Sequence, residues 1–243
     1  MNLATRILST TFLAGILSSS SLFAATVGNG SFYLGGTAQG MTNGLAFFLT
    51  GLGDQHAVAL SPFTGIFAPP ASTALTAGTT QTIRDLTTTN GVIPGTNFDF
   101  VNWIQLSDGI NFDAMTLPIP TMVPVCTGGE AIGTSCRVNA LSPVLLTQGP
   151  FGVSASLNIF GSAHFAGDTT LTPFSAFFTA PSVNFPTIAQ FLAAFNSSGE
   201  IPNVGYTVNI ITTSAVPEPA TMAIIGLGAV GLGIFGRRKM RKH

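Results

Sequence analysis

An uncharged apolar run near the end of the 243-residue chain limits which residues can belong to a folded body. The run extends from Met222 to Phe235 and consists of Ala, Ile, Gly, Leu, Val, Met and Phe. Counted from 220 to 236, it has roughly the 17 residues that the shortest membrane-spanning helices need. A span must satisfy its own backbone hydrogen bonds, so this segment is expected to form a transmembrane helix.

Positive charge gathers directly behind this run. Residues 237–243 hold five of the chain's eight Lys and Arg residues, namely Arg237, Arg238, Lys239, Arg241 and Lys242. The positive-inside rule therefore predicts that this basic end stops transfer and stays on the cytoplasmic side of the inner membrane. A buried apolar helix with a basic end is the alternative interpretation.

The tail as a whole, residues 216–243, resembles a known sorting signal. Pro217, Glu218 and Pro219 precede the apolar run, and the two prolines keep this triplet out of a helix. A Pro-Glu-Pro triplet, a glycine-rich span and a basic end follow in the order of the PEP-CTERM sorting domain of Gram-negative bacteria that make exopolysaccharide. That resemblance implies that exosortase, a membrane protease, recognises residues 217–219 and processes the chain nearby.

Residues 1–25 are expected to form a secretory signal peptide. Arg6 supplies the positive start, a mostly apolar stretch follows over 7–17, and Ala24 and Ala25 offer small residues for cleavage. A helix of the folded domain is the alternative. The two end segments leave residues 26–215 as the exported body, a length that suits one domain.

Charge distinguishes this body from the two ends of the chain. Residues 26–215 contain two cations, Arg84 and Arg137, against eight Asp and Glu residues, which gives a net charge of −6. An acidic body with so few cations argues against binding nucleic acid or another polyanion through charge. We therefore expect no nucleic-acid partner.

The residue pattern of the body predicts a mainly β fold. Gly, Thr, Ser, Asn and Pro interrupt it every several residues, and the stretches between are rich in Phe, Val, Ile and Thr, which is typical of sandwiches and barrels. Residues 151–160 alternate apolar and polar side chains, as a strand with one buried face does. Residues 172–180 form another expected strand. We predict an antiparallel β-sandwich.

One short helix is expected near the C-terminal end of this domain. Thr187 and Gln190 have the spacing of a capping box. Residues 188–195 then place apolar side chains at the i, i+3, i+4 and i+7 positions of one helix face. We expect the helix to plug an open end of the sandwich.

The chain has two cysteines, Cys126 and Cys136. An exported body lies in an oxidising compartment, where such a pair is expected to form a disulfide. Two free thiols are one alternative. A metal pair is another, although a metal would need further ligands at matching spacing.

Asp108, Asn111 and Asp113 form a weak candidate for a calcium site, because Ca²⁺ takes oxygen ligands. Their spacing is not that of an EF-hand. A hairpin turn stabilised by the Asp and Asn side chains explains the same residues and is the favoured interpretation. No other metal and no cofactor is expected.

No motif in the chain identifies a catalytic activity, since GxSxG, HExxH and a phosphate loop are absent. His56 and His164 lie in what look like polar turns, so a hydrolase is the least favoured hypothesis. We expect a non-enzymatic, exported protein that the tail anchors transiently and that is sorted to the cell surface, envelope or exopolysaccharide matrix.

A polysaccharide- or calcium-binding module is the alternative function. Rings that stack on sugars are usually those of Trp and Tyr. The chain has twenty Phe residues but one Trp and two Tyr residues, so its composition does not favour sugar binding.

Overall fold

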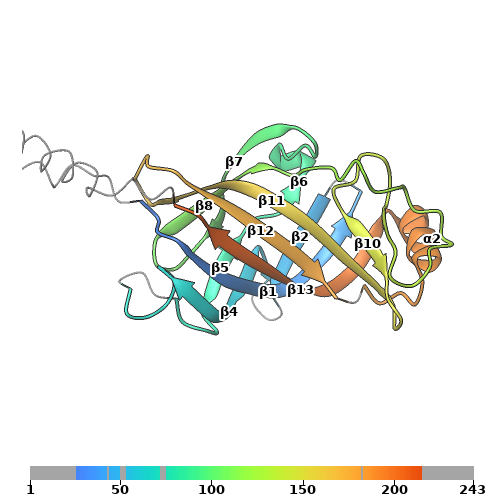
Figure 1. The fold of residues 1–243 in the computed structure, drawn as a ribbon, viewed down its shortest axis with the longest axis horizontal. Helices are drawn as coiled ribbons and strands as arrows, with labels where there is room; N and C mark the ends of the chain where they lie inside the picture. Colours follow the sequence, from blue (N-terminus) through green and yellow to red (C-terminus); the bar gives the residue numbers. More distant parts are fainter. Residues whose placement is uncertain (1–25, 43, 50–52, 72–74, 182, 215–243) are drawn as a thin grey trace, which may run out of the picture. The chain divides into compact units, whose positions relative to one another are not determined.

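The computed structural model describes residues 26–214 except residues 43, 50–52, 72–74 and 182 (Figure 1). The chain divides into two units after Thr213. The expected signal peptide, sorting motif, transmembrane segment and basic end therefore lie outside the described residues. None of the helices found within the described ranges is long and apolar enough to cross a membrane.

The described residues are mainly β, as the sequence pattern predicts. The strands are β1 (Gly30–Met41), β2 (Gly44–Leu49), β3 (Gly53–Asp54), β4 (His56–Gly65), β5 (Thr80–Ile83), β6 (Leu86–Thr87), β7 (Asn97–Gln105), β8 (Ile110–Thr116), β9 (Ser135–Arg137), β10 (Leu145–Gln148), β11 (Val153–Phe165), β12 (Thr172–Ala180) and β13 (Glu200–Thr212). A 3₁₀ turn, η2 (Thr88–Asn90), and one helix, α2 (Ile188–Ser198), complete the elements.

The strands form one antiparallel sheet that closes on itself. Eight of them follow one another around the ring in the order β12, β13, β1, β4, β5, β7, β8 and β11, and β11 pairs again with β12. The predicted sandwich is therefore wrong, and the body is an eight-stranded barrel. Alternation along a strand shows which side chains face the core in either architecture, but it does not show whether the outermost strands meet.

The ring closes at Gly161 of β11. Gly161 pairs with Ala114 of β8 on one side and with Phe174 of β12 on the other. A Cβ atom at Gly161 would lie 1.9 Å from the carbonyl oxygen of Asp113. Glycine is thus the residue that lets β11 approach β8 this closely, and a register shift between Phe160 and Gly161 marks the same place.

Aromatic side chains fill the inside of the barrel. The rings of Phe32, Phe67 and Phe112 are fully buried, and their centroids lie 4.6 to 6.4 Å apart. All residues of the hydrophobic core in the described part of the chain lie between Val27 and Ile210, within the body. Because the body has a closed sheet and a core of its own, we expect it to fold without the tail.

The expected helix near the end of the domain is confirmed as α2. Thr187 is its N-cap and accepts a hydrogen bond from the Gln190 N–H (3.3 Å), and Gly199 ends it in a left-handed conformation with φ 72°. Figure 1 shows α2 at one end of the barrel. Gly30 pairs with Thr212 at the other end, so the two chain ends of the barrel lie side by side there.

Candidate functional site

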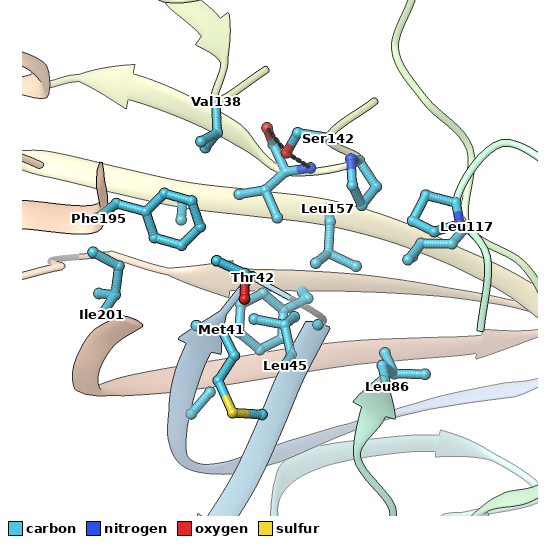
Figure 2. Close-up of a pocket in the computed structure, with 18 of the residues that line it drawn as sticks. Met41, Thr42, Leu45, Leu86, Leu117, Val138, Ser142, Leu157, Phe195 and Ile201 are labelled. Atoms are coloured by element: carbon cyan, nitrogen blue, oxygen red, sulfur yellow. Dashed lines mark hydrogen bonds between the residues drawn. The ribbon is translucent and has the colours of Figure 1, made fainter. Parts of the chain in front are cut away.

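A large apolar pocket lies at the α2 end of the barrel, with a volume of about 640 Å³. At this end β1 pairs with β2 instead of β4, and β11 pairs with β10 instead of β8. The sheet therefore divides into two arms, β2–β6 and β10–β9, and the pocket lies between them. Figure 2 shows side chains from the β1–β2 hairpin facing those of the segment 138–144.

The walls of the pocket are apolar. Leu157 of β11, Phe178 of β12 and Ile201 of β13 are buried side chains that line it. Among the described residues that line the pocket, none carries a charged side chain. Sequence reasoning missed this pocket, because its lining residues have the same pattern as those of an ordinary core.

The few polar side chains of the lining lie at the mouth or are already hydrogen-bonded. Thr42, Thr88 and Asn139 are exposed. The buried Ser142 hydroxyl accepts a hydrogen bond from the Val144 N–H (3.1 Å) and donates to the Val144 carbonyl (3.4 Å), as Figure 2 shows. The interior of the pocket therefore offers little to a polar ligand.

The segment 138–144, which forms one wall of the pocket, follows a strand that carries a disulfide and Arg137. Cys126 and Cys136 are bonded to each other, as expected, with their Cα atoms 4.9 Å apart. The Arg137 side chain donates from Nε to the Val123 carbonyl (2.8 Å) and from Nη1 to the Ala140 carbonyl (2.7 Å). The bond to Ala140 ties the wall to β9, whereas the disulfide and the bond to Val123 tie β9 to the segment before it.

Glu130 lies inside the ring that the disulfide closes. Its carboxylate accepts hydrogen bonds from the Thr127 hydroxyl and N–H and from the Gly128 N–H. Burial raises the pKa of Glu130, but these hydrogen bonds outweigh it and leave the pKa below its ordinary value.

Free thiols and a metal pair were the alternatives to the disulfide. A carboxylate oxygen of Glu130 and the sulfurs of Cys126 and Cys136 lie within 4.8 Å of one another. Because the sulfurs are bonded to each other, neither is a thiolate that could hold a metal. The structure contradicts both alternatives.

The residues of the weak calcium candidate have separate roles: Asp108 stabilises a turn, whereas Asp113 contacts neighbouring strands. The Asp108 Oδ1 atom accepts from the Ile110 N–H (3.2 Å), which is the predicted Asp-stabilised turn. Burial raises the pKa of Asp108, and hydrogen bonds from the backbone offset this only in part. Asn111 follows in β8, and calcium binding by these residues stays the weaker, untested hypothesis.

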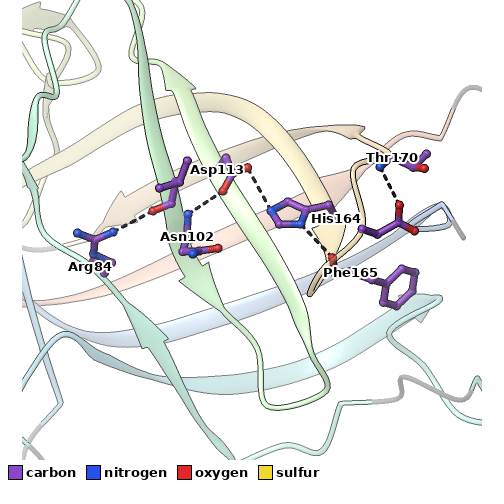
Figure 3. A network of polar contacts seen from close by, with 8 residues as sticks. Arg84, Asn102, Asp113, His164, Phe165 and Thr170 are labelled. Carbon is purple, nitrogen blue, oxygen red and sulfur yellow. Dashed lines mark hydrogen bonds and ion pairs between the residues drawn. The ribbon is translucent and has the colours of Figure 1, made fainter. Parts of the chain in front are cut away.

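Asp113, the third calcium candidate, joins β8 to both of its neighbours, as Figure 3 shows. Its Oδ1 atom accepts from the Asn102 N–H of β7 (2.7 Å), and its Oδ2 atom lies 3.2 Å from Nε2 of His164 in β11. His164 Nδ1 lies 3.0 Å from the Phe165 carbonyl. Both carboxylate oxygens are therefore engaged where the barrel closes.

The hydrolase hypothesis gains no support from this cluster. The expectation that His56 and His164 lie in turns is wrong, because they belong to β4 and β11. Within the described residues, His164 makes polar contacts with Asp113 and a backbone carbonyl. The hydrogen bond from the Thr170 N–H is the main cause that lowers the pKa of Asp168, and His164 also contributes to lowering it. A Ser–His–Asp arrangement would also need a nucleophile beside the ring.

Two of the three rings considered for sugar stacking are in the core. Trp103 is fully buried, and Tyr206 is 3 % exposed. Burial also raises the pKa of the Tyr206 hydroxyl. Only Tyr33 keeps intermediate exposure, so the described residues do not present a row of Trp and Tyr rings to a polysaccharide.

Comparison with known proteins bears on the tail. A family model of the PEP-CTERM protein-sorting motif matches residues 215–241. The chain carries a PEP-CTERM sorting motif. The matched range includes Pro217, Glu218 and Pro219, the apolar run and the basic residues up to Arg241. This motif implies export, C-terminal membrane anchoring and processing by exosortase. No curated protein and no solved structure matched the chain.

Proposed function

We propose that this exosortase substrate is a non-enzymatic component of the cell envelope or the exopolysaccharide matrix. The PEP-CTERM motif carries the proposal, because it pairs a recognition triplet at 217–219 with a membrane segment at 220–236. The signal peptide at 1–25 directs the chain across the inner membrane, the tail holds it there, and exosortase then frees the body from the membrane segment.

The contacts of the two cations in the body support a role that does not depend on binding a polyanion. Arg84 donates from Nη1 to the Val101 carbonyl (2.9 Å), and its guanidinium lies 4.5 Å from the ring centre of Phe100. Arg137 donates to two backbone carbonyls. Both cations therefore stabilise the fold and do not form a cluster that would attract a polyanion.

The architecture of the body suits a protein that works outside the cytoplasm. A closed sheet removes most of the unpaired strand edges through which β proteins aggregate. The Cys126–Cys136 disulfide is of the kind that persists in an oxidising compartment.

Processing is tested by a pulse-chase experiment with an antibody against the body. We expect the wild-type chain to shorten and leave the membrane in a host that has exosortase, and to stay full-length in the same host without exosortase. A variant with Pro217, Glu218 and Pro219 all replaced by alanine should stay full-length in both hosts.

The matched control is Glu200→Gln, which changes an exposed acid of the body outside the tail. This variant should be processed like the wild type. A wild-type chain that keeps its length in the host with exosortase would contradict the sorting proposal. Recovery of the processed body in neither the envelope nor the matrix fraction would contradict its destination.

A further inference from the structure

We propose that the pocket at the α2 end of the barrel binds the hydrocarbon chain of a neutral single-chain lipid, such as a fatty alcohol or a fatty-acid ester. This inference goes beyond the sorting role, because it assigns a ligand to the body itself. It depends on the size of the pocket, the chemistry of its walls and the composition of its mouth.

The size of the pocket is that of a ligand site and not of a packing defect. Its volume of about 640 Å³ lies within the range of roughly 300–1,000 Å³ that small-molecule sites span. Protein interiors leave few voids larger than a water molecule. At a liquid volume of about 30 Å³ for each water, the space equals about twenty waters. Hydrocarbon that displaces water from such walls is favoured.

The walls select against charge. Within the described lining there is no Lys, Arg, His, Asp or Glu, so a charged head group drawn inside would lose its hydration without gaining a counter-ion. The polar lining residues Thr42, Thr88 and Asn139 are exposed. The polar end of a ligand therefore stays at the mouth, in contact with water and with these three side chains.

Sugars and peptides fit these walls less well than hydrocarbon does. Both carry several hydrogen-bonding groups that would need partners once buried. The one buried polar side chain of the described lining, Ser142, already exchanges hydrogen bonds with the Val144 backbone. An alkyl chain has no such requirement.

The membrane is the source of the lipid, and this one step rests on the proposed function. Before processing, the tail holds the body at a membrane, where single-chain amphiphiles are concentrated. The volume and the apolar walls of the pocket favour a hydrocarbon chain whatever the source of the lipid. Binding can therefore fail while processing succeeds, and the two outcomes are measured in separate experiments.

The direct test is a chain-length series on the purified body, residues 26–216. 1-Octanol, 1-decanol and 1-dodecanol compete with the neutral dye Nile red, whose fluorescence reports an apolar environment. Each added methylene should tighten binding by about fourfold until the pocket is full. Octanoate, decanoate and dodecanoate at pH 8 should bind more weakly than the matched alcohols. Affinity that is independent of chain length, or that is equal or higher for the carboxylates, would overturn the proposal.

Two variants in β11 test whether the ligand binds in the pocket. Ala155 lines the pocket, whereas Ser156 does not, because neighbouring strand residues point to opposite faces. Ala155→Phe should weaken 1-dodecanol binding at least about tenfold by filling the pocket, and Ser156→Phe should leave it unchanged. Equal loss in both, or no loss in either, would place the ligand elsewhere.

A variant at a second position keeps the test usable if Ala155→Phe does not fold. Leu45 lies at the mouth on β2 and is only partly buried, so Leu45→Trp obstructs the entrance with less strain on the core. It should slow both the uptake and the release of 1-dodecanol, while Ser156→Phe should change neither rate. Each variant is first checked by its melting curve, and the wild-type chain-length series decides the proposal if neither variant folds.

Discussion

Replacing Gly161 by alanine tests whether the sheet really closes. The added Cβ would lie 1.9 Å from the Asp113 carbonyl oxygen and 2.8 Å from the Phe174 ring. Overpacking usually costs about 1–3 kcal/mol. The nearer atom here belongs to the backbone of β8 and cannot move aside by rotating a side chain. We therefore expect a loss of at least about 3 kcal/mol in the free energy of unfolding.

The assay is urea unfolding of the body, followed by the fluorescence of Trp103. This residue is the only Trp in the chain, is fully buried, and stacks on Phe174 with ring centroids 6.1 Å apart. The loss should appear as a lower midpoint concentration of urea. In a thermal melt of the same variant it should lower the melting temperature by roughly 6–12 °C.

Gly205→Ala is the matched control for Gly161→Ala, since it also changes a strand glycine. A Cβ at Gly205 meets nothing within 4 Å, so this variant should stay within about 0.5 kcal/mol of wild type. If Gly161→Ala also stays within that limit, β11 does not touch β8 and the barrel is open.

Three further predictions use the same unfolding assay. Cys126→Ser with Cys136→Ser should lose about 3 kcal/mol, the chain-entropy value for a ring of this size, and a loss below about 1 kcal/mol would show that the disulfide constrains little. Thr187→Ala removes the α2 N-cap that accepts from the Gln190 N–H and should cost about 1 kcal/mol, whereas Thr187→Ser should be nearly neutral. Because burial raises the pKa of Asp108, its contribution to stability is present below the ordinary value of 3.8 and is lost as pH rises through the folded pKa. Asp108→Asn should therefore melt above wild type at pH 7 and lose this advantage towards pH 3; an advantage that does not change with pH would contradict the reasoning.

The sequence predicts local structure well where alternation is unbroken. The predicted strand over 172–180 is β12 with the same bounds, because every second side chain from Thr172 to Ala180 is buried. The strand predicted over 151–160 is less accurate. β11 begins at Val153, and Phe151 is fully exposed in the turn before it. The prediction failed there because the sequence around Phe151 does not show whether this apolar side chain is buried or exposed.

Closure and the pocket depend on contacts between residues far apart in the chain. Nothing in the sequence around Gly161 distinguishes it from Gly205, and only the positions of β8 and β12 make the first one necessary. The pocket likewise combines residues as distant as Thr42 and Ile201. A buried side chain that faces a cavity satisfies the same periodicity as one that faces another side chain.

The tail, by contrast, could be recognised from its sequence, because its signal is carried by residue order and charge along a single segment. The triplet 217–219, the apolar run and the basic end suffice without any partner elsewhere in the chain. The pocket of the body has no comparable local signal, because its lining residues come from distant parts of the chain.

The intact mass of the protein recovered from a host with exosortase shows whether the tail has been removed. We predict a polypeptide that lacks about the first 25 residues and ends near the motif at 217–219, without the apolar run and the basic end. A mass that still includes residues 220–243 in every cellular and extracellular fraction would contradict the account.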